Sequence, residues 1–262
     1  MTREPTRRSV NSACMALRGG LRIRAWSVAE HVTSHRTIMH EQRFFPEGSR
    51  VFENEFAERY LSRVHPAFPG VFWGPIALLA IGWGAYAGVP LWATGGMAVA
   101  GFLSWTLFEY ILHRWVFHFV PESDTVKRLW YPVHQIHHDF QEWDRIVAPP
   151  LLSGGLCAIF LALFWLVFGT PWMWPFFGGF TLGYLAYDYV HYFTHFGTPK
   201  TWIGKGLRRR HLQHHHAWHN RWYGVSSPLW DYVFRTHVRR GERAPREREG
   251  DQVVWPPKKV HG

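Results

Sequence analysis

Two long stretches without charged side chains or histidine dominate the pattern of apolar and polar positions along the chain. Residues 71–108 form a stretch of 38 residues and residues 146–187 one of 42. A helix that crosses a membrane needs about 20 apolar residues, so each stretch is long enough for two passes. Gly88-Val89-Pro90 and Gly169-Thr170-Pro171 interrupt them near their middles, as tight connections would. The pattern predicts an all-α, integral membrane protein with four transmembrane helices arranged as two hairpins.

A soluble protein with two long buried helices is the alternative interpretation. Uncharged stretches of this length are uncommon in soluble cores, so we favour the membrane. The hairpins are expected at about residues 71–112 and 148–190, and the segments around them are polar.

An amphipathic helix is predicted just before the first apolar stretch. Phe52, Phe56, Tyr60 and Val64 recur at helical spacing, with charged residues on the opposite side. Such a helix is typical of a segment that lies on a membrane surface. The sequence HPAFPG at 65–70 then breaks the helix and leads into the first pass.

Histidines cluster at the ends of the apolar stretches. The chain has 18 histidines. Ten of them fall into four clusters: His113 and His118; His134, His137 and His138; His191 and His195; His211, His214 and His215. Both triplets have the spacing H-x-x-H-H, which brings the imidazoles to one side of a helix.

This number of imidazoles indicates a metal centre with two ions. Imidazole is the commonest metal ligand among side chains, and a catalytic site with one metal ion typically uses three protein ligands. Ten histidines therefore fit two ions with about five ligands each, which leaves positions open for oxygen or water. The nitrogen donors suit iron, zinc or copper. We predict no catalytic side chain beyond this metal centre.

The two-hairpin topology predicts that all four clusters lie on one side of the membrane. Each hairpin returns to the side that it enters, so the clusters can meet in a helical cap. Arg114, Lys127, Arg128 and the basic run at 205–210 share that side, which the positive-inside rule makes cytosolic.

Two carboxylates are predicted to support the ligands. Glu109 precedes His113 by one helical turn and Asp188 precedes His191 by three residues, so each could accept the second N–H of an imidazole. Direct ligation by carboxylates would need paired Glu-x-x-His motifs, and the chain has only Asp188-Tyr-Val-His191. His113 and His118 are about 140° apart on an ideal α-helix, so they need a helix end or a distortion to reach one ion.

The charge of the chain is concentrated at its ends. The net charge is +10, with seven Lys/Arg against two acids in residues 1–36 and fourteen against five in residues 200–262. We expect contact with anionic membrane lipids and no nucleic acid, since no nucleic-acid module is recognisable. Cys14 and Cys157 indicate no disulfide framework, which suits a reducing compartment.

These patterns divide the chain into four parts. Residues 1–38 are a basic extension, either a targeting segment or a stretch upstream of a true start at Met39. Residues 39–70 are the interfacial segment, residues 71–240 the membrane domain with the histidines, and residues 241–262 a polar tail.

The motifs also resemble a known family. In order, EYILHRWVFH, HQIHHDF, DRIVAPP, DYVHYFTH, RRRHLQHHH and YGVSSPLWDYVFRT resemble the membrane fatty acid hydroxylases of the sterol desaturase and hydroxylase superfamily. The resemblance spans roughly residues 100–236, and the motifs are most similar to those of the fatty acid 2-hydroxylases of sphingolipids. It implies that the ten clustered histidines are the metal ligands and that residues 71–240 form a fatty acid hydroxylase domain.

The resemblance implies an O2-dependent hydroxylase that acts on a lipid acyl chain next to its carbonyl group. Two iron ions (Fe2+) are expected, with zinc able to take their place during purification. Eukaryotic relatives often carry a fused cytochrome b5 domain with an HPGG motif, to which only HPAFPG is faintly similar here. We therefore expect an external electron donor: cytochrome b5, a ferredoxin or another carrier. Phe108, Trp115, Phe117 and Trp222 are predicted walls for the acyl chain.

Other functions are compatible with the same clusters. A desaturase, a sterol oxidase or a carotenoid hydroxylase of the superfamily would share them. A metal transporter or another non-enzymatic metal-binding membrane protein is the alternative outside the superfamily, although transport favours ionisable residues within the spans and the two apolar stretches have none. The expected location is a bacterial inner membrane or the endoplasmic reticulum, with the active site on the cytoplasmic side.

Overall fold

The computed structural model describes residue 52 and residues 54–244 of the chain. This described part contains helices and irregular segments and no β-strand, which confirms the predicted all-α class for it. The predicted basic extension at residues 1–38 lies outside the described residues, as do most of the polar tail at 241–262 and the first part of the interfacial segment.

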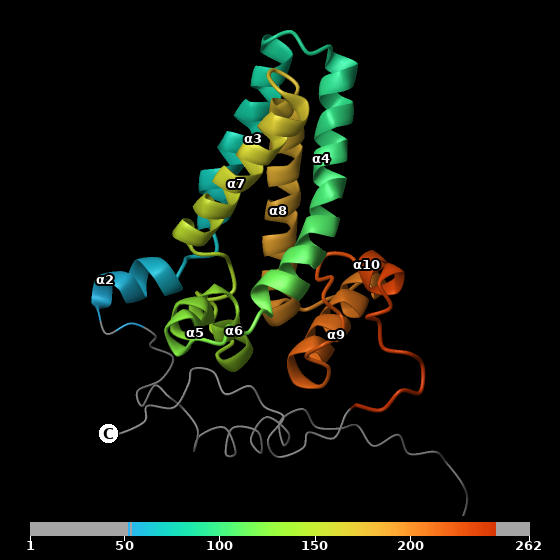
Figure 1. The fold of residues 1–262 in the computed structure, drawn as a ribbon. Helices are drawn as coiled ribbons and strands as arrows, with labels where there is room; N and C mark the ends of the chain where they lie inside the picture. The colour runs from blue at the N-terminus through green and yellow to red at the C-terminus, as the bar shows by residue number, and fades with distance from the viewer. Residues whose placement is uncertain (1–51, 53, 245–262) are drawn as a thin grey trace, which may run out of the picture. The chain divides into compact units, whose positions relative to one another are not determined.

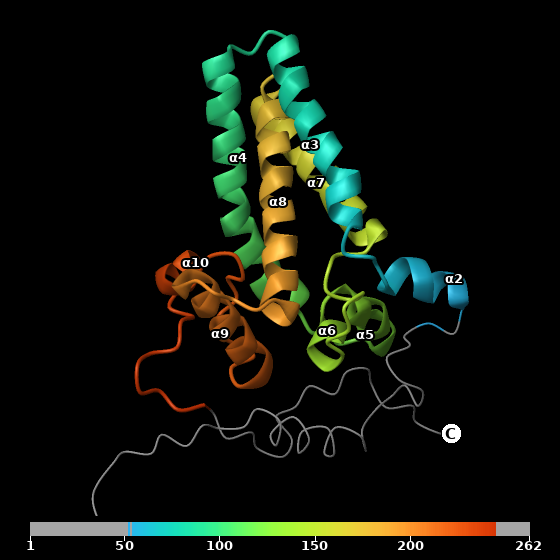
Figure 2. The same cartoon turned by 180° about the vertical axis from the view of Figure 1, so that it is seen from behind.

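Four long helices lie side by side (Figures 1 and 2). They are α3 (Phe68–Tyr86), α4 (Leu91–Ile111), α7 (Pro150–Phe168) and α8 (Met173–Phe196). The predicted Gly/Pro interruptions are confirmed as the connections, since α3 is joined to α4 through residues 87–90 and α7 to α8 through 169–172. Gly88 and Gly169 have φ angles of 102° and 63°, which glycine adopts without the steric cost that other residues incur.

Three segments are long and apolar enough to cross a membrane: α3, α7, and α4 together with its continuation to Phe117. The helix α8 is not one of them, although it is the longest single helix. It lies in the centre and contacts the other three, and most of its residues from Met173 to Tyr187 are buried. Its many glycine and aromatic residues therefore serve packing against helices.

Glycine lets α4 and α8 approach each other closely. A Cβ atom on Gly179 of α8 would lie 1.9 Å from the carbonyl oxygen of Ala98, and one on Gly101 of α4 would lie 2.1 Å from that of Phe176. Small residues at a helix interface allow the backbones to touch in this way. The contact fixes α4, which leads to the first histidine pair, against α8, which carries another.

The remaining helices gather at the end of the four long helices that is opposite the connections (Figure 1). A π-helical segment, η2 (Leu112–Phe117), continues α4. It is followed by α5 (Asp124–Trp130), the 3-10 turn η3 (Tyr131–Val133) and α6 (Gln135–Asp139), and later by α9 (Trp202–His216) and α10 (Leu229–Val233). This end of the helices holds all four histidine clusters.

A short helical segment precedes α3, as the amphipathic pattern predicts. It consists of α2 (Glu55–Ala57) and the π-helical η1 (Glu58–Ser62). Phe56 and Tyr60 face outward with 70% and 50% of their surface exposed, whereas Glu58 and Ser62 are buried. The helix thus turns polar groups toward the protein and an aromatic pair away from it. Its location on a membrane surface stays a prediction.

The contact between α4 and α8 generates a prediction. Gly179→Ala should force the two backbones apart and lower the stability by about 1–3 kcal/mol, the usual cost of overpacking. The measurement is the thermal unfolding midpoint of the detergent-purified protein. Gly95→Ala on α4 is the matched control, because nothing lies within 4 Å of its added Cβ. Equal midpoints for the two variants would contradict the close-packing argument.

Candidate metal centre

The ten predicted ligands converge into two groups of imidazoles. The first histidine group contains His113, His118, His134, His138 and His214, and the second contains His137, His191, His195, His211 and His215. Within each group the donor nitrogen atoms lie within 4.8 Å of one another. Two nitrogens on opposite sides of one ion are about 4 Å apart, since each bond measures about 2.0–2.1 Å. Each group is therefore close to the size of one coordination sphere.

Several imidazoles are separated by the distance expected of neighbouring ligands. The Nε2 atoms of His118 and His214 lie 3.0 Å apart, those of His134 and His138 3.1 Å, and those of His195 and His211 2.8 Å. Two ligands that meet at a right angle on one ion, with bonds of roughly 2.1 Å, are about 3 Å apart. The two groups adjoin, because the rings of His138 and His215 stack at a centroid distance of 4.0 Å.

Buried nitrogens without partners support a metal at this position. Among the described residues, ring nitrogens of six histidines are buried and accept or donate no hydrogen bond: His113, His137, His191, His195, His211 and His215. A buried polar atom left without a partner costs about 1–3 kcal/mol. A cation that accepts the lone pairs would remove this cost, so the donor set fits two metal ions.

Burial favours the neutral form of the imidazoles in the two histidine groups. Burial, followed by the charges of neighbouring imidazoles, lowers the pKa of His134 well below its usual range, and the same causes act on His211. Burial also gives low pKa values to His137, His138, His214 and His215. A neutral imidazole offers the lone pair that a metal ion requires.

The distortion predicted for the first histidine pair is confirmed. The α-helical pattern of α4 changes at Leu112 into the π-helix η2, and the N–H of His118 donates to the carbonyl oxygen of His113 at 3.2 Å. In a π-helix the hydrogen bond joins residues five apart, so such residues come to the same side. His113 and His118 thereby enter the same histidine group.

The two H-x-x-H-H triplets each contribute to both groups. His134 and His138 belong to the first group and His137 to the second, while His214 belongs to the first and His211 and His215 to the second. The spacing was expected to bring all three imidazoles to one side, but adjacent residues of an α-helix are about 100° apart, so the last two histidines of each triplet belong to different groups. Each triplet therefore connects the two histidine groups.

Backbone carbonyl groups orient two of the ligands, a feature that the sequence analysis missed. His113 Nδ1 lies 2.6 Å from the carbonyl oxygen of Tyr223, and His214 Nδ1 lies 2.7 Å from that of Arg221. When Nδ1–H donates to a carbonyl, Nε2 is left to face the metal. The motif YGVSSPLWDYVFRT was the available signal, but nothing in it identifies a carbonyl group as a partner. Between the two residues, Trp222 has a positive φ of 57°.

Two buried carboxylates hold the loop that carries these carbonyl groups. Asp231 accepts hydrogen bonds from the backbone N–H groups of Tyr223 and Gly224, both at 2.9 Å. Glu109 accepts from the N–H groups of Val225 at 2.6 Å and Ser226 at 2.8 Å, and also from the Ser226 hydroxyl. Glu109 thus supports His113 through the loop, whereas we expected a direct hydrogen bond to an imidazole.

Asp188 has a different environment from Glu109. It is buried beside the second histidine group, and one of its carboxylate oxygens has no hydrogen-bond partner among the described residues. Whether it supports a ligand remains a prediction. His216 and His219 are exposed and belong to neither group.

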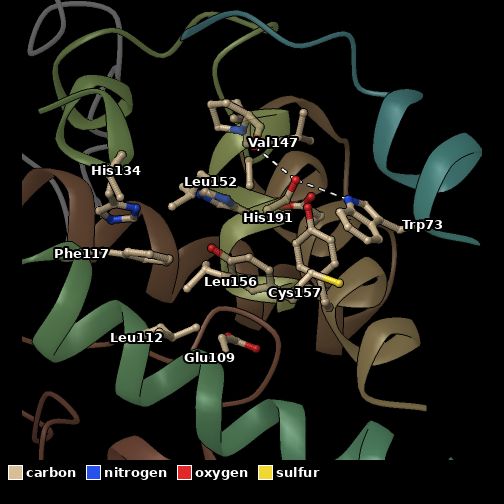
Figure 3. A pocket seen from close by; sticks show the side chains of 18 of the residues that line it. Trp73, Glu109, Leu112, Phe117, His134, Val147, Leu152, Leu156, Cys157 and His191 are labelled. Atoms are coloured by element: carbon tan, nitrogen blue, oxygen red, sulfur yellow. Dashed lines mark hydrogen bonds between the residues drawn. The ribbon is translucent and has the colours of Figure 1, made fainter. Parts of the chain in front are cut away.

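An apolar cavity is lined in part by the histidines (Figure 3). His134, His137 and His191 are among its lining residues. Half of its lining residues belong to α4, α7 and α8, among them Trp105, Leu156, Phe160 and Phe180. Of the four aromatic walls expected from the sequence, Phe117 lines the cavity. The arrangement suits a long apolar molecule with one end beside the metal ligands.

Comparison with known proteins shows similarity to fatty acid hydroxylases. A family model described as fatty acid hydroxylase matches residues 98–236. Dihydroceramide fatty acyl 2-hydroxylase FAH2 of Arabidopsis thaliana is 36% identical over 195 residues, which cover 72% of this chain and 80% of that protein. Ceramide very long chain fatty acid hydroxylase SCS7 of Saccharomyces cerevisiae is 33% identical, covering 79% of this chain and 54% of that protein.

The fold is similar to a solved structure as well. The structure of full-length Scs7p, in which only the hydroxylase domain is visible, superposes with a TM-score of 0.68 at 31% identity. The match covers 74% of each chain.

The division into two groups predicts the metal content of variants. His191→Ala removes a ligand of the second group alone, so the purified protein should lose close to one of two bound ions. The measurement is the metal-to-protein ratio by inductively coupled plasma mass spectrometry, with circular dichroism to verify folding. His216→Ala, at an exposed histidine outside both groups, is the control and should keep the full metal content. An unchanged ratio in His191→Ala would contradict its role as a ligand.

Proposed function

Because the chain belongs to the fatty acid hydroxylase family, we propose that it is a membrane-bound, O2-dependent di-iron hydroxylase of lipid acyl chains. The substrate is a fatty acyl group, in a sphingolipid or as a fatty acid, and the hydroxyl group enters at C2, next to the carbonyl. In the balanced reaction, C–H, O2, two electrons and two protons give C–OH and water. The observation that carries the proposal is the apolar cavity whose lining includes members of two adjoining groups of five histidines.

The ten histidines would hold two iron ions in this proposal. Iron would supply the activation of O2 that the reaction requires, and zinc is expected to take the site when iron is lacking. Glu109 would act on this centre through the loop of Tyr223, and Asp188 from beside the second histidine group. The chain's own part in the reaction is to orient the acyl group in the cavity and to exclude water.

The proposed membrane arrangement has four passes in two hairpins, with α8 as the fourth. The fourth pass needs less apolar surface than the others because three helices surround it. The helices α5, α6, α9 and α10 would form a cytosolic cap over the membrane ends. Arg114 and the basic residues of α9 lie at this end, in agreement with the positive-inside rule. A bacterial inner membrane or the endoplasmic reticulum would provide this setting.

Electrons are proposed to come from an external carrier, such as cytochrome b5 or a ferredoxin. The relatives reported above are named as hydroxylases, which favours hydroxylation over desaturation, sterol oxidation or carotenoid hydroxylation. The same names disfavour a non-enzymatic metal-binding protein or transporter.

The test is lipid analysis of a host that expresses the chain together with an electron carrier. We expect acyl chains that have gained one oxygen atom, located at C2 by fragmentation in the mass spectrometer. His137→Ala should lower this product roughly a hundredfold or more, since loss of even an indirect support of a ligand costs 10–100-fold. His216→Ala serves as the control and should retain the product.

Two other results would contradict the proposal. Acyl chains that lose two hydrogen atoms would indicate a desaturase. Unchanged lipids, despite full metal content and a working electron carrier, would indicate another substrate or a non-enzymatic protein.

A further inference from the structure

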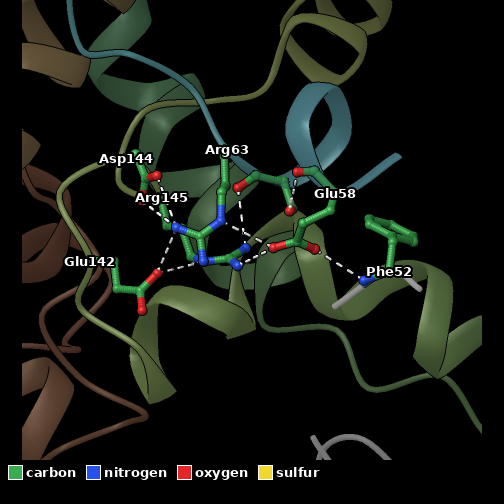
Figure 4. A network of polar contacts seen from close by, with 7 residues as sticks. Phe52, Glu58, Arg63, Glu142, Asp144 and Arg145 are labelled. Carbon is green, nitrogen blue, oxygen red and sulfur yellow. Dashed lines mark hydrogen bonds and ion pairs between the residues drawn. The ribbon is translucent and has the colours of Figure 1, made fainter. Parts of the chain in front are cut away.

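A buried arginine joins the segment before α3 to the segment before α7 (Figure 4). The side chain of Arg145 has 0% of its surface exposed. Its guanidinium pairs with Glu58 of η1, donates to Glu142 at 3.2 Å and donates to the carbonyl oxygen of Ser62 at 3.3 Å. Arginine suits this position because its planar group can donate in several directions at once.

A second arginine strengthens the same junction. Arg63 donates to both carboxylate oxygens of Asp144, at 3.0 and 2.9 Å, and pairs with Glu58 at 3.1 Å. The backbone N–H of Val64 also donates to the carbonyl oxygen of Asp144 at 2.7 Å. Residues 58–64 and 142–145 are therefore held together by side chains and by backbone.

The second of these segments continues directly into the cavity wall. Arg145, Ile146, Val147, Ala148 and Pro149 all line the cavity. Ile146 and Val147 are buried, and the backbone of Ala148 hydrogen-bonds to the carboxylate of Asp188, three residues before His191 on α8. The wall is therefore next to the part of an acyl chain that would react.

Glu58 itself is not part of the wall. It does not line the cavity, and it reaches the wall through Arg145. Without the charge of Glu58, the buried guanidinium of Arg145 would keep only Glu142, which is more exposed, as a carboxylate partner, and its charge would be less well compensated. A change at Glu58 should therefore release Arg145 and loosen the wall without altering any atom that lines the cavity.

We propose that Glu58 and Arg145 form a positioning pair that fixes the cavity wall at residues 145–149 and thereby selects the acyl carbon that is hydroxylated. This inference rests on the proposed function. The pair contributes no atom to the reaction. It acts through the wall that it holds, so its loss should change where the acyl chain is hydroxylated as well as how fast.

The experiment compares Glu58→Gln with Arg59→Gln in the full-length, metal-loaded protein. The first substitution keeps the shape of the Glu58 side chain and removes its charge, whereas Arg59 is an exposed residue of the same segment. The first readout is hydrogen–deuterium exchange of the peptide covering residues 145–152. We expect exchange roughly tenfold faster in Glu58→Gln, with the peptide of α9 unchanged, because only the wall is loosened.

The second readout is the position of the hydroxyl group in the lipid products. In Glu58→Gln the rate at C2 should fall on the order of tenfold, and the share of product hydroxylated at other carbons should rise. A merely destabilised protein would give less product with the same positional distribution. Glu58→Asp, which restores the charge, should recover most of the C2 product, and Arg59→Gln should resemble the wild type.

The outcomes separate this inference from the proposed function. Unchanged exchange at residues 145–152 in Glu58→Gln would overturn the coupling, and faster exchange with an unchanged product distribution would overturn the positioning role. A wild-type protein that hydroxylates no lipid would contradict the proposed function, and the exchange measurement would still decide whether Glu58 holds the wall.

Discussion

Ten imidazoles lie close together in two groups, and the structure around them depends on giving their buried ring nitrogens partners. Eight of them are buried, and six have ring nitrogens without a hydrogen-bond partner among the described residues. Such a cluster is unfavourable without cations, because each buried lone pair without a partner costs free energy and each protonated ring would repel its neighbours. Metal binding would convert this cost into stabilisation, so assembly of the cap and loading of metal should be linked.

The surrounding elements follow from that constraint. The π-helix after α4 brings His113 and His118 to one side, which a regular α-helix would not do. The loop at 221–226 then supplies carbonyl groups to His113 and His214, and the carboxylates of Asp231 and Glu109 hold that loop. The candidate metal centre is thus supported in two steps: carbonyl groups orient the imidazoles, and carboxylates hold the loop that carries the carbonyl groups.

Much of this could be predicted from the sequence, because local spacing determines it. The four clusters, the connections at Gly88 and Gly169 and the distortion between His113 and His118 all depend on neighbouring residues. The role of Glu109 could not be predicted, since its partners Val225 and Ser226 are more than a hundred residues away in the chain. The division of each triplet between two groups also depends on how distant helices pack.

The proposed entry of an acyl chain from a membrane explains why rigid walls would matter in this cavity. An acyl chain that moves from a bilayer into an apolar cavity gains little hydrophobic free energy, because lipid tails are as apolar as the side chains of the wall. The position of the chain must then be determined by shape and by contacts at its polar end. The aromatic side chains of α4, α7 and α8 provide shape, but the wall at 145–149 is not helical before Pro150. An irregular segment has no ladder of backbone hydrogen bonds to stiffen it, so the ion pairs of Arg145 and Arg63 supply the rigidity that a helix would otherwise give.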